Sequence, residues 1–248
     1  MKEMIQTHDD LLDMLDDLLR EPTAFWNDFY ADRDKRIPFF VNKPDENLVR
    51  YFERGIIAPG HVLKLGCGPG RNALYFARQG CTVTAVDLSR QSLAWARERA
   101  QEEQLDVDFI ERNIFDFPLA KEAYDIVYDS GCFHHIAPHR RRDYLTLVTD
   151  SLKHGGHFAL TCFIEGGELG GSDISDWEVY RTRSLNGGLG FTEEKLRLIF
   201  ADFDVIEIRP MPMMPASATT FGRTGLWTAV FQKKHDNGPL LYKKNVAT

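Results

Sequence analysis

One stretch of the sequence decides the fold that we predict: Leu65-Gly66-Cys67-Gly68-Pro69-Gly70-Arg71-Asn72. It follows a short apolar run, residues 62–65, and it precedes a helical stretch that ends before Gly80. A glycine-rich turn between a strand and a helix is the setting in which a main chain contacts a ligand closely, because glycine has no Cβ to stand in the way. We therefore expect a ligand at this turn.

The spacing of the glycines narrows the class of ligand. A dinucleotide loop, G-x-G-x-x-G/A, would need a small residue where Arg71 stands, and the G-x-x-x-x-G-K-[ST] phosphate loop does not occur in the sequence. Asp87 follows the next apolar run, about 20 residues after Gly66, where an acid accepts hydrogen bonds from ribose hydroxyls. The alternative for Asp87 is a capping role before the helix that Ser89 begins. Turn and acid together predict a cofactor that contains a nucleoside.

Apolar runs and helical stretches alternate along most of the chain, which predicts an α/β fold with a mainly parallel sheet and right-handed crossovers. An amphipathic helix over residues 11–19, ended by Pro22, and a second helix over 46–54 come first. The expected strands are 62–65, 82–86, 107–111, 125–128, 158–163, 205–208 and 227–232, and the later helices are 72–79, 90–103, 140–152 (ended by Gly155-Gly156) and 192–201. Residues 164–190 and 211–225 are predicted loops.

Composition and charge exclude several classes of protein. The chain of 248 residues carries a formal net charge of −7, which disfavours a nucleic-acid partner. No run approaches the roughly 18 apolar residues of a membrane span, and no apolar core of a signal peptide follows Met1. The four cysteines have no C-x-x-C spacing and are expected to be reduced. We expect a cytoplasmic protein without a membrane or nucleic-acid partner, as a monomer or homodimer.

Residues 62–70 and 83–89, taken together, resemble the first two motifs of the class I S-adenosylmethionine-dependent methyltransferases. Residues 113–116 and 124–130 fall where the third and fourth motifs of that family should lie. Arg71-Asn72, with the aromatic residues of 25–30 upstream, resembles the thiopurine and tellurite-resistance type of small-molecule methyltransferase. The resemblance covers roughly residues 25–233.

The resemblance implies an architecture and a division of the chain. The fold would be a Rossmann-like three-layer sandwich with a mostly parallel seven-stranded sheet whose last strand is antiparallel. We expect an N-terminal helical lid in residues 1–45, the methyltransferase domain in 46–234 and a mobile tail in 235–248.

The resemblance also implies residue roles, with S-adenosylmethionine as the cofactor. The turn would pass under the methionine part, Asp87 would hold the ribose, and Asp129 would reach the amino-acid end or the reaction site. Leu88 would flank the adenine, with Asn113 at its edge and Ile114 on its face. The full predicted cofactor site is Trp26, Gly66, Cys67, Gly68, Gly70, Asn72, Asp87, Leu88, Asn113, Ile114 and Asp129. Two departures stand out: Lys64 occupies a position where the family usually has an acid, and Asn113 one where Asp is common.

The expected chemistry is an in-line displacement at the methyl carbon of a sulfonium, which an enzyme assists mainly by alignment in a dry chamber. The aromatic residues that would close this chamber are Trp26, Tyr30, Phe39 and Phe40. His134 or His135, next to Asp129, is the candidate base, since the pKa of histidine is close to neutral. Further histidines stand at 139, 154 and 157, but no cysteine or acid joins them at a zinc-site spacing, so no metal is expected.

We therefore predict methyl transfer to a small-molecule nucleophile, with the catalytic residues Asp129, His134 and His135. Two alternatives remain open at this stage. Lys64 leaves room for a protein that binds the cofactor without transferring its methyl group, and the glycine turn leaves room for an NAD-dependent oxidoreductase. Asp129-Ser130-Gly131-Cys132 stands where a DNA amino-methyltransferase needs an Asn/Asp-Pro-Pro-aromatic motif, which disfavours that class.

Overall fold

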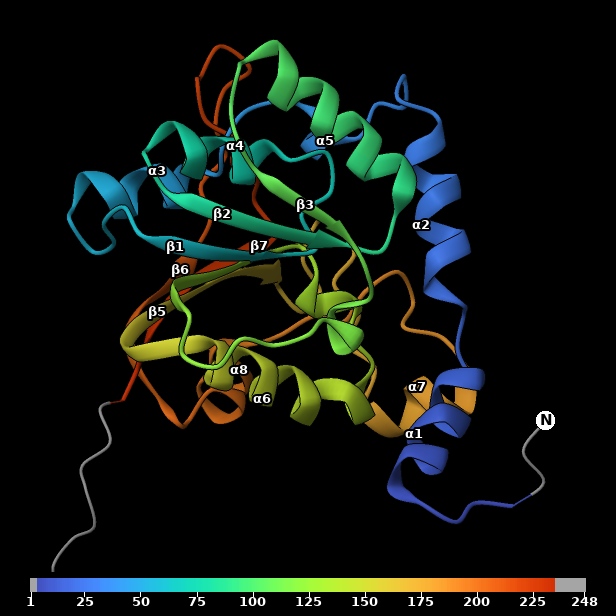
Figure 1. The fold of residues 1–248 in the computed structure, drawn as a ribbon. Coiled ribbons are helices and arrows are strands. Elements are labelled where there is room, and N and C mark those ends of the chain that lie inside the picture. The colour runs from blue at the N-terminus through green and yellow to red at the C-terminus, as the bar shows by residue number, and fades with distance from the viewer. Residues whose placement is uncertain (1–3, 235–248) are drawn as a thin grey trace, which may run out of the picture.

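The computed structural model describes residues 4–234, which form one seven-stranded sheet between two layers of helices (Figure 1). The strand order is β3-β2-β1-β4-β5-β7-β6, and β7 is antiparallel to both of its neighbours while the other pairings are parallel. The predicted fold class is confirmed. The strands are β1 (His61–Leu65), β2 (Thr82–Asp87), β3 (Asp108–Glu111), β4 (Tyr124–Ser130), β5 (Leu152–Phe163), β6 (Phe203–Pro210) and β7 (Leu226–Lys233).

Helices cover both faces of the sheet, with α3, α4 and α5 on one side and α6 and α8 on the other (Figure 1). Side chains cap two of the helices: Thr7 and Asp10 make a capping box, and the hydroxyl of Ser89, where a helix start is predicted, accepts the N–H of Ser92. The helices are α1 (His8–Asp17), α2 (Pro22–Ala31), α3 (Glu46–Glu53), α4 (Arg71–Arg78), α5 (Arg90–Glu102), α6 (Arg141–Ser151), α7 (Asp176–Thr182) and α8 (Glu193–Ile199).

Three local predictions are wrong. Pro22 does not end the first helix; it is the first residue of α2, where its missing N–H costs no hydrogen bond. Gly155 and Gly156 do not end α6 but lie within β5, which starts directly after that helix and shifts its register against β4. The predicted loop 164–190 contains α7, which begins at a capping box that Ser175 and Glu178 form.

The N-terminal segment lies across the carboxyl ends of the central strands, where α2 stands beside α5 (Figure 1). The Ser89 hydroxyl donates to the main-chain oxygen of Trp26. Helix α1 is held by Asp16, whose carboxylate accepts hydrogen bonds from Arg140 and pairs with the His139 ring. This arrangement suits the lid predicted for residues 1–45, a boundary that stays a prediction. The predicted mobile tail, 235–248, lies outside the described residues.

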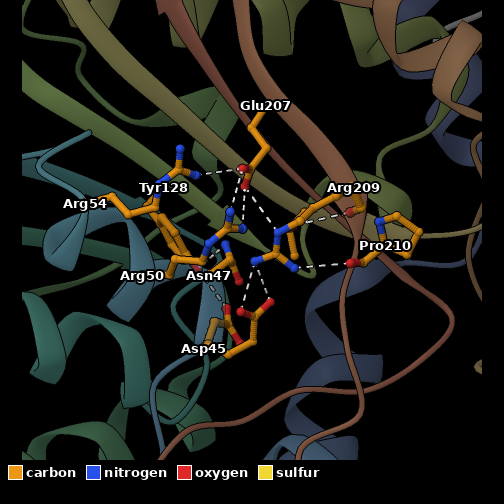
Figure 2. A network of polar contacts seen from close by, with 10 residues as sticks. Asp45, Asn47, Arg50, Arg54, Tyr128, Glu207, Arg209 and Pro210 are labelled. Atoms are coloured by element: carbon orange, nitrogen blue, oxygen red, sulfur yellow. Dashed lines mark hydrogen bonds and ion pairs between the residues drawn. The ribbon is translucent and has the colours of Figure 1, made fainter.

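A carboxylate on β6 fixes helix α3 to the far edge of the sheet. Figure 2 shows Glu207 facing Arg50 of α3, Arg54 directly after that helix, and Arg209 of its own strand. Arg50 donates to both carboxylate oxygens at 2.9 and 3.0 Å, and Arg54 adds a bond of 2.9 Å. Just before α3, Asp45 accepts hydrogen bonds from Arg71, Asn72 and Tyr128. Helix α3 thereby links the edge of the sheet to the end of the glycine turn.

Glu207→Gln is expected to lower the free energy of unfolding by about 1–3 kcal/mol, because an amide cannot balance the arginines around it. Urea unfolding measures the change. Glu193→Gln is the matched control, since Glu193 pairs with Arg197 on an exposed helix face and such pairs contribute under about 1 kcal/mol. Equal losses in the two variants would contradict this reading of the network.

Candidate active site

A large cavity lies between the carboxyl ends of the central strands and the N-terminal segment. Its volume is about 1170 Å³, which is ample for a nucleoside cofactor together with a small acceptor. Most of the residues predicted for the site contribute to its walls: Trp26, Gly66, Cys67, Gly68, Asn72, Asp87, Leu88, Asn113, Ile114, His134 and His135. Gly70 and Asp129 do not.

The glycine turn requires its glycines. Gly66, Gly68 and Gly70 have φ values of +54°, +52° and +84°, a region that other residues rarely adopt. A Cβ on Gly66 would lie 2.7 Å from the Cβ of Cys132, and one on Gly68 would lie 3.1 Å from the hydroxyl of Tyr30. The turn therefore lies tightly packed between the loop that follows β4 and Tyr30 of α2. Cys67, at its centre, is buried, and burial raises the pKa of its thiol.

Asp87 is buried at the end of β2 beside this turn. Its two oxygens accept the N–H groups of Gly68 at 2.7 Å and Ser89 at 2.8 Å. Burial raises the pKa of Asp87, and these hydrogen bonds, together with the charge of Lys64, oppose that shift. Each carboxylate oxygen can accept more than one hydrogen bond, so both remain able to bind hydroxyl groups. The capping and ribose-binding interpretations are thus compatible.

The walls beside Asp87 suit a flat heterocycle. Leu88 is half-buried, Ile114 is buried, and both line the cavity. Asn113 begins a short 3₁₀ turn, where its side-chain oxygen accepts the N–H of Phe115 at 3.1 Å. That hydrogen bond leaves the amide NH₂ of Asn113 available to a ligand.

Two predicted site residues are committed elsewhere. Both ends of the Asn72 amide bond Asp45: its oxygen accepts the Asp45 N–H and its nitrogen donates to the carboxylate, each at 2.9 Å. Asp129 is fully buried, and its oxygens accept the Cys132 N–H and the Tyr144 hydroxyl at 2.9 and 2.6 Å. Burial raises the pKa of Asp129. Asp129 thus holds the loop that carries the histidines instead of facing the cavity.

Four rings in continuous contact form part of the cavity wall. Trp26 contacts His135 edge to face, with 4.8 Å between the ring centroids. The centroids of His135 and His134 lie 4.4 Å apart, and His134 stacks on Phe163 with a centroid separation of 3.7 Å. Tyr30 and Phe39, also predicted for the chamber, line the cavity, whereas Phe40 packs against Trp95. Sequence reasoning missed Phe163, and its place at the end of β5 is the signal that could have found it.

The two histidines are neutral at neutral pH and differ in their partners. Burial lowers the pKa of His134 well below its usual value, and its Nδ1 accepts the Phe163 N–H at 3.3 Å. Burial and the charge of Arg20 lower the pKa of His135 to about 3, and its Nδ1 has no partner among the described residues. Thr161 of β5 also lines the cavity, and its hydroxyl is likewise buried and unpaired within residues 4–234. Sequence analysis did not single out Thr161 as a site residue.

Comparison with known proteins decides the family. Residues 62–156 match the family described as a methyltransferase domain. An uncharacterized methyltransferase of Schizosaccharomyces pombe, C750.03c, is 32% identical over 126 residues, which are 50% of this chain and 84% of that one. The chain belongs to the class I methyltransferases. The cofactor of this methyltransferase is S-adenosylmethionine, as predicted, and an oxidoreductase is no longer a candidate.

Two further relatives fit this assignment. The methyltransferase is 36% identical over 80 residues to a probable S-adenosyl-L-methionine-dependent methyltransferase, TehB, of Haemophilus influenzae, over 32% of this chain and 27% of that one. Its fold matches a Burkholderia thailandensis 1,6-didemethyltoxoflavin-N1-methyltransferase, solved with its acceptor and S-adenosylhomocysteine, with a TM-score of 0.61 at 20% identity over 95% and 93% of the two chains.

The residues present fit the cofactor. A turn with three glycines, a carboxylate able to accept further hydrogen bonds, apolar walls and a ring cluster could receive its methionine, ribose, adenine and sulfonium parts, respectively. Within the described part of the chain, no group of three His, Cys, Asp or Glu side chains is arranged to hold a metal ion. None of the helices in residues 4–234 has the length and apolar character that crossing a membrane requires.

Proposed function

We propose that this methyltransferase transfers the methyl group of S-adenosylmethionine to a protic small molecule that lies between His135 and Thr161. The observation that supports the proposal is a pair of buried polar atoms, His135 Nδ1 and Thr161 Oγ1, that line the cavity without a partner among the described residues. A buried polar atom without a hydrogen bond costs roughly 1–3 kcal/mol, so such atoms mark a place where a ligand supplies the partner.

In this proposal the cofactor lies along the edge formed by β1, β2 and β4. Asp87 accepts the ribose hydroxyls, Leu88 and Ile114 enclose the adenine, and the amide of Asn113 bonds its edge. The glycine turn lies against the methionine part. When bound, the cofactor supplies an activated methyl group on a positively charged sulfur.

The chain's contribution is alignment and exclusion of water. The ring cluster of Trp26, His135, His134 and Phe163 gives the acceptor side an apolar wall, in which charge cancellation between an anionic nucleophile and a sulfonium is favoured. The neutral His135 ring can accept a hydrogen bond from the acceptor and so orient it, because one of its nitrogens carries a lone pair. Asp129 is a positioning residue. It holds the loop that carries the histidines by accepting the N–H of Cys132, and it holds helix α6 by accepting the hydroxyl of Tyr144.

Small acceptors are favoured over macromolecules because α1 and α2 contribute side chains to the wall of the cavity and so restrict access to it. The Burkholderia thailandensis relative acts on such a molecule. The sequence-based expectations of a cytoplasmic protein, of a monomer or homodimer and of no nucleic-acid partner stay predictions.

The test is release of S-adenosylhomocysteine from S-adenosylmethionine over a panel of thiols, phenols, amines and chalcogen oxyanions. We expect at least one acceptor class to accelerate release over the rate without acceptor, and Thr161→Val to raise KM for that acceptor. Tight cofactor binding without release over the whole panel would support a non-catalytic binding protein instead. Absence of cofactor binding, measured by calorimetry on the folded protein, would overturn the proposal.

A further inference from the structure

Lys64 places a positive charge beneath the glycine turn, inside the wall of the cavity. It lies on β1, is only 1% exposed, and contributes to the lining of the cavity. Its ammonium donates to the main-chain oxygens of Leu65 at 2.6 Å and Gly66 at 3.1 Å. An ammonium has three N–H donors, so one donor is left after these two bonds.

The charges around Lys64 show why an ammonium is stable there. Its charge acts on the buried carboxylates of Asp87, the last residue of β2, and Asp129, the last but one of β4, on the two strands that flank β1. Both carboxylates already accept hydrogen bonds, Asp87 from the N–H of Gly68 and Asp129 from the N–H of Cys132 and the hydroxyl of Tyr144 on α6. Within residues 4–234 no hydrogen bond joins either carboxylate to Lys64, so the remaining donor of its ammonium is not committed to them.

The amino-acid end of S-adenosylmethionine carries one carboxylate and one ammonium. A ligand ammonium placed at the oxygens of Leu65 and Gly66 would lie next to the like charge of Lys64, and like charges at short range inside a protein repel strongly. A ligand carboxylate would instead receive a charge-assisted hydrogen bond, which is among the strongest polar contacts in proteins. The sign of the buried charge therefore selects the group that lies beside it.

We propose that Lys64 binds the carboxylate of the cofactor's methionine part and so selects ligands that carry this carboxylate. The inference rests on the proposed function, because it assumes that the adenosyl ligand lies along the glycine turn. The carboxylate would thus be bound by a side chain of β1 beneath the turn. The main-chain oxygens of Leu65 and Gly66 already accept hydrogen bonds from that side chain.

The test is a thermodynamic cycle in which the Lys64 side chain and the ligand carboxylate are removed separately and together. Calorimetry gives the dissociation constant of each combination. Wild type and Lys64→Met are titrated with S-adenosylmethionine and with decarboxylated S-adenosylmethionine, which lacks only the carboxylate. In the wild type we expect the decarboxylated ligand to bind at least about tenfold more weakly. In Lys64→Met the two ligands should bind within about threefold of each other, because the partner of the carboxylate is gone.

Two further variants separate this contact from general electrostatics and from loss of structure. Lys64→Arg keeps the charge and should keep most of the tenfold preference. Arg112→Gln removes another cation of the cavity wall, next to Asn113 in the sequence, and should leave the preference unchanged. Thermal melting establishes that each variant is folded.

Each result decides one question. An equal preference in the wild type and a folded Lys64→Met variant overturns the inference while leaving the proposed function intact. Failure of the wild type to bind either ligand overturns the proposed function itself. If Lys64→Met does not fold, a crystal structure of the wild type with S-adenosylhomocysteine decides: a carboxylate within hydrogen-bond distance of Lys64 Nζ supports the inference, and one beyond about 4 Å overturns it.

Discussion

His135→Phe is expected to lower kcat by about 100-fold while leaving the dissociation constant of S-adenosylmethionine within about threefold of the wild type. Phenylalanine keeps the ring that contacts Trp26 and His134, at 4.8 and 4.4 Å, and removes only the nitrogens. The loss is therefore expected in the catalytic step and in acceptor binding, not in cofactor binding. Single-turnover kinetics with an acceptor from the panel, alongside calorimetry, separates the two.

The electrostatics of this ring predict the pH dependence of the reaction. Because burial and Arg20 lower the pKa of His135 to about 3, the ring stays neutral down to weakly acid pH. The rate should therefore show no loss from protonation of His135 as the pH falls through 6.5, the ordinary pKa of histidine. An acid limb near pH 6.5 that disappears in His135→Phe would contradict this. His154→Gln is the control, since His154 pairs with Glu122 at the start of β5, away from the cavity.

Asp87→Asn is expected to weaken S-adenosylmethionine binding by at least tenfold. An amide offers one acceptor oxygen in place of two, and the carboxylate already serves the N–H groups of Gly68 and Ser89. Charge-assisted hydrogen bonds to ribose hydroxyls contribute roughly 1.5–3 kcal/mol each, or about one to two decades of affinity. Calorimetry measures the change.

Two comparisons make the Asp87 result specific. Asp116→Asn removes another acid of the cavity wall and should change affinity by less than about threefold, because Asp116 is exposed. A ligand without ribose hydroxyls, 2′,3′-dideoxyadenosine, should bind Asp87→Asn and wild type equally, whereas adenosine should prefer the wild type. Wild-type affinity for S-adenosylmethionine in folded Asp87→Asn would remove the ribose role from Asp87.

Local sequence patterns were enough to predict most of the fold, because each pattern reflects main-chain geometry that residues close together in the sequence determine. The turn at residues 66–70 needs glycine for its positive φ values, and Ser89 caps its helix through a bond to a residue three positions on. Alternation of apolar runs and helices then leaves few ways to cover both faces of a parallel sheet. The short helix α7 and the early start of β5 escaped because tertiary packing, not periodicity, set their limits.

The site residues also fall into two groups, those that local spacing could predict and those whose role depends on partners from distant segments. Asp87 and Leu88, which line the cavity, could be assigned by their spacing of about 20 residues from Gly66. Asn72 and Asp129 could not, because their partners Asp45 and Tyr144 come from other elements and draw them into structural bonds. Spacing gives a residue's position on its strand, but only packing determines which of its neighbours satisfies its polar atoms.

By itself, the amino-acid sequence determined the strand–turn–helix at the glycine turn, the acid that ends β2 and hence the class of cofactor, since all depend on backbone conformation and short spacings. Only the tertiary structure decided what lies opposite that cofactor site. Residues of α2, the end of β5 and the loop after β4 meet there, and among the described residues His135 and Thr161 keep polar atoms without a partner while Lys64 keeps a spare donor. Burial and hydrogen-bond pairing are properties of contacts between distant segments, so no single segment carries them.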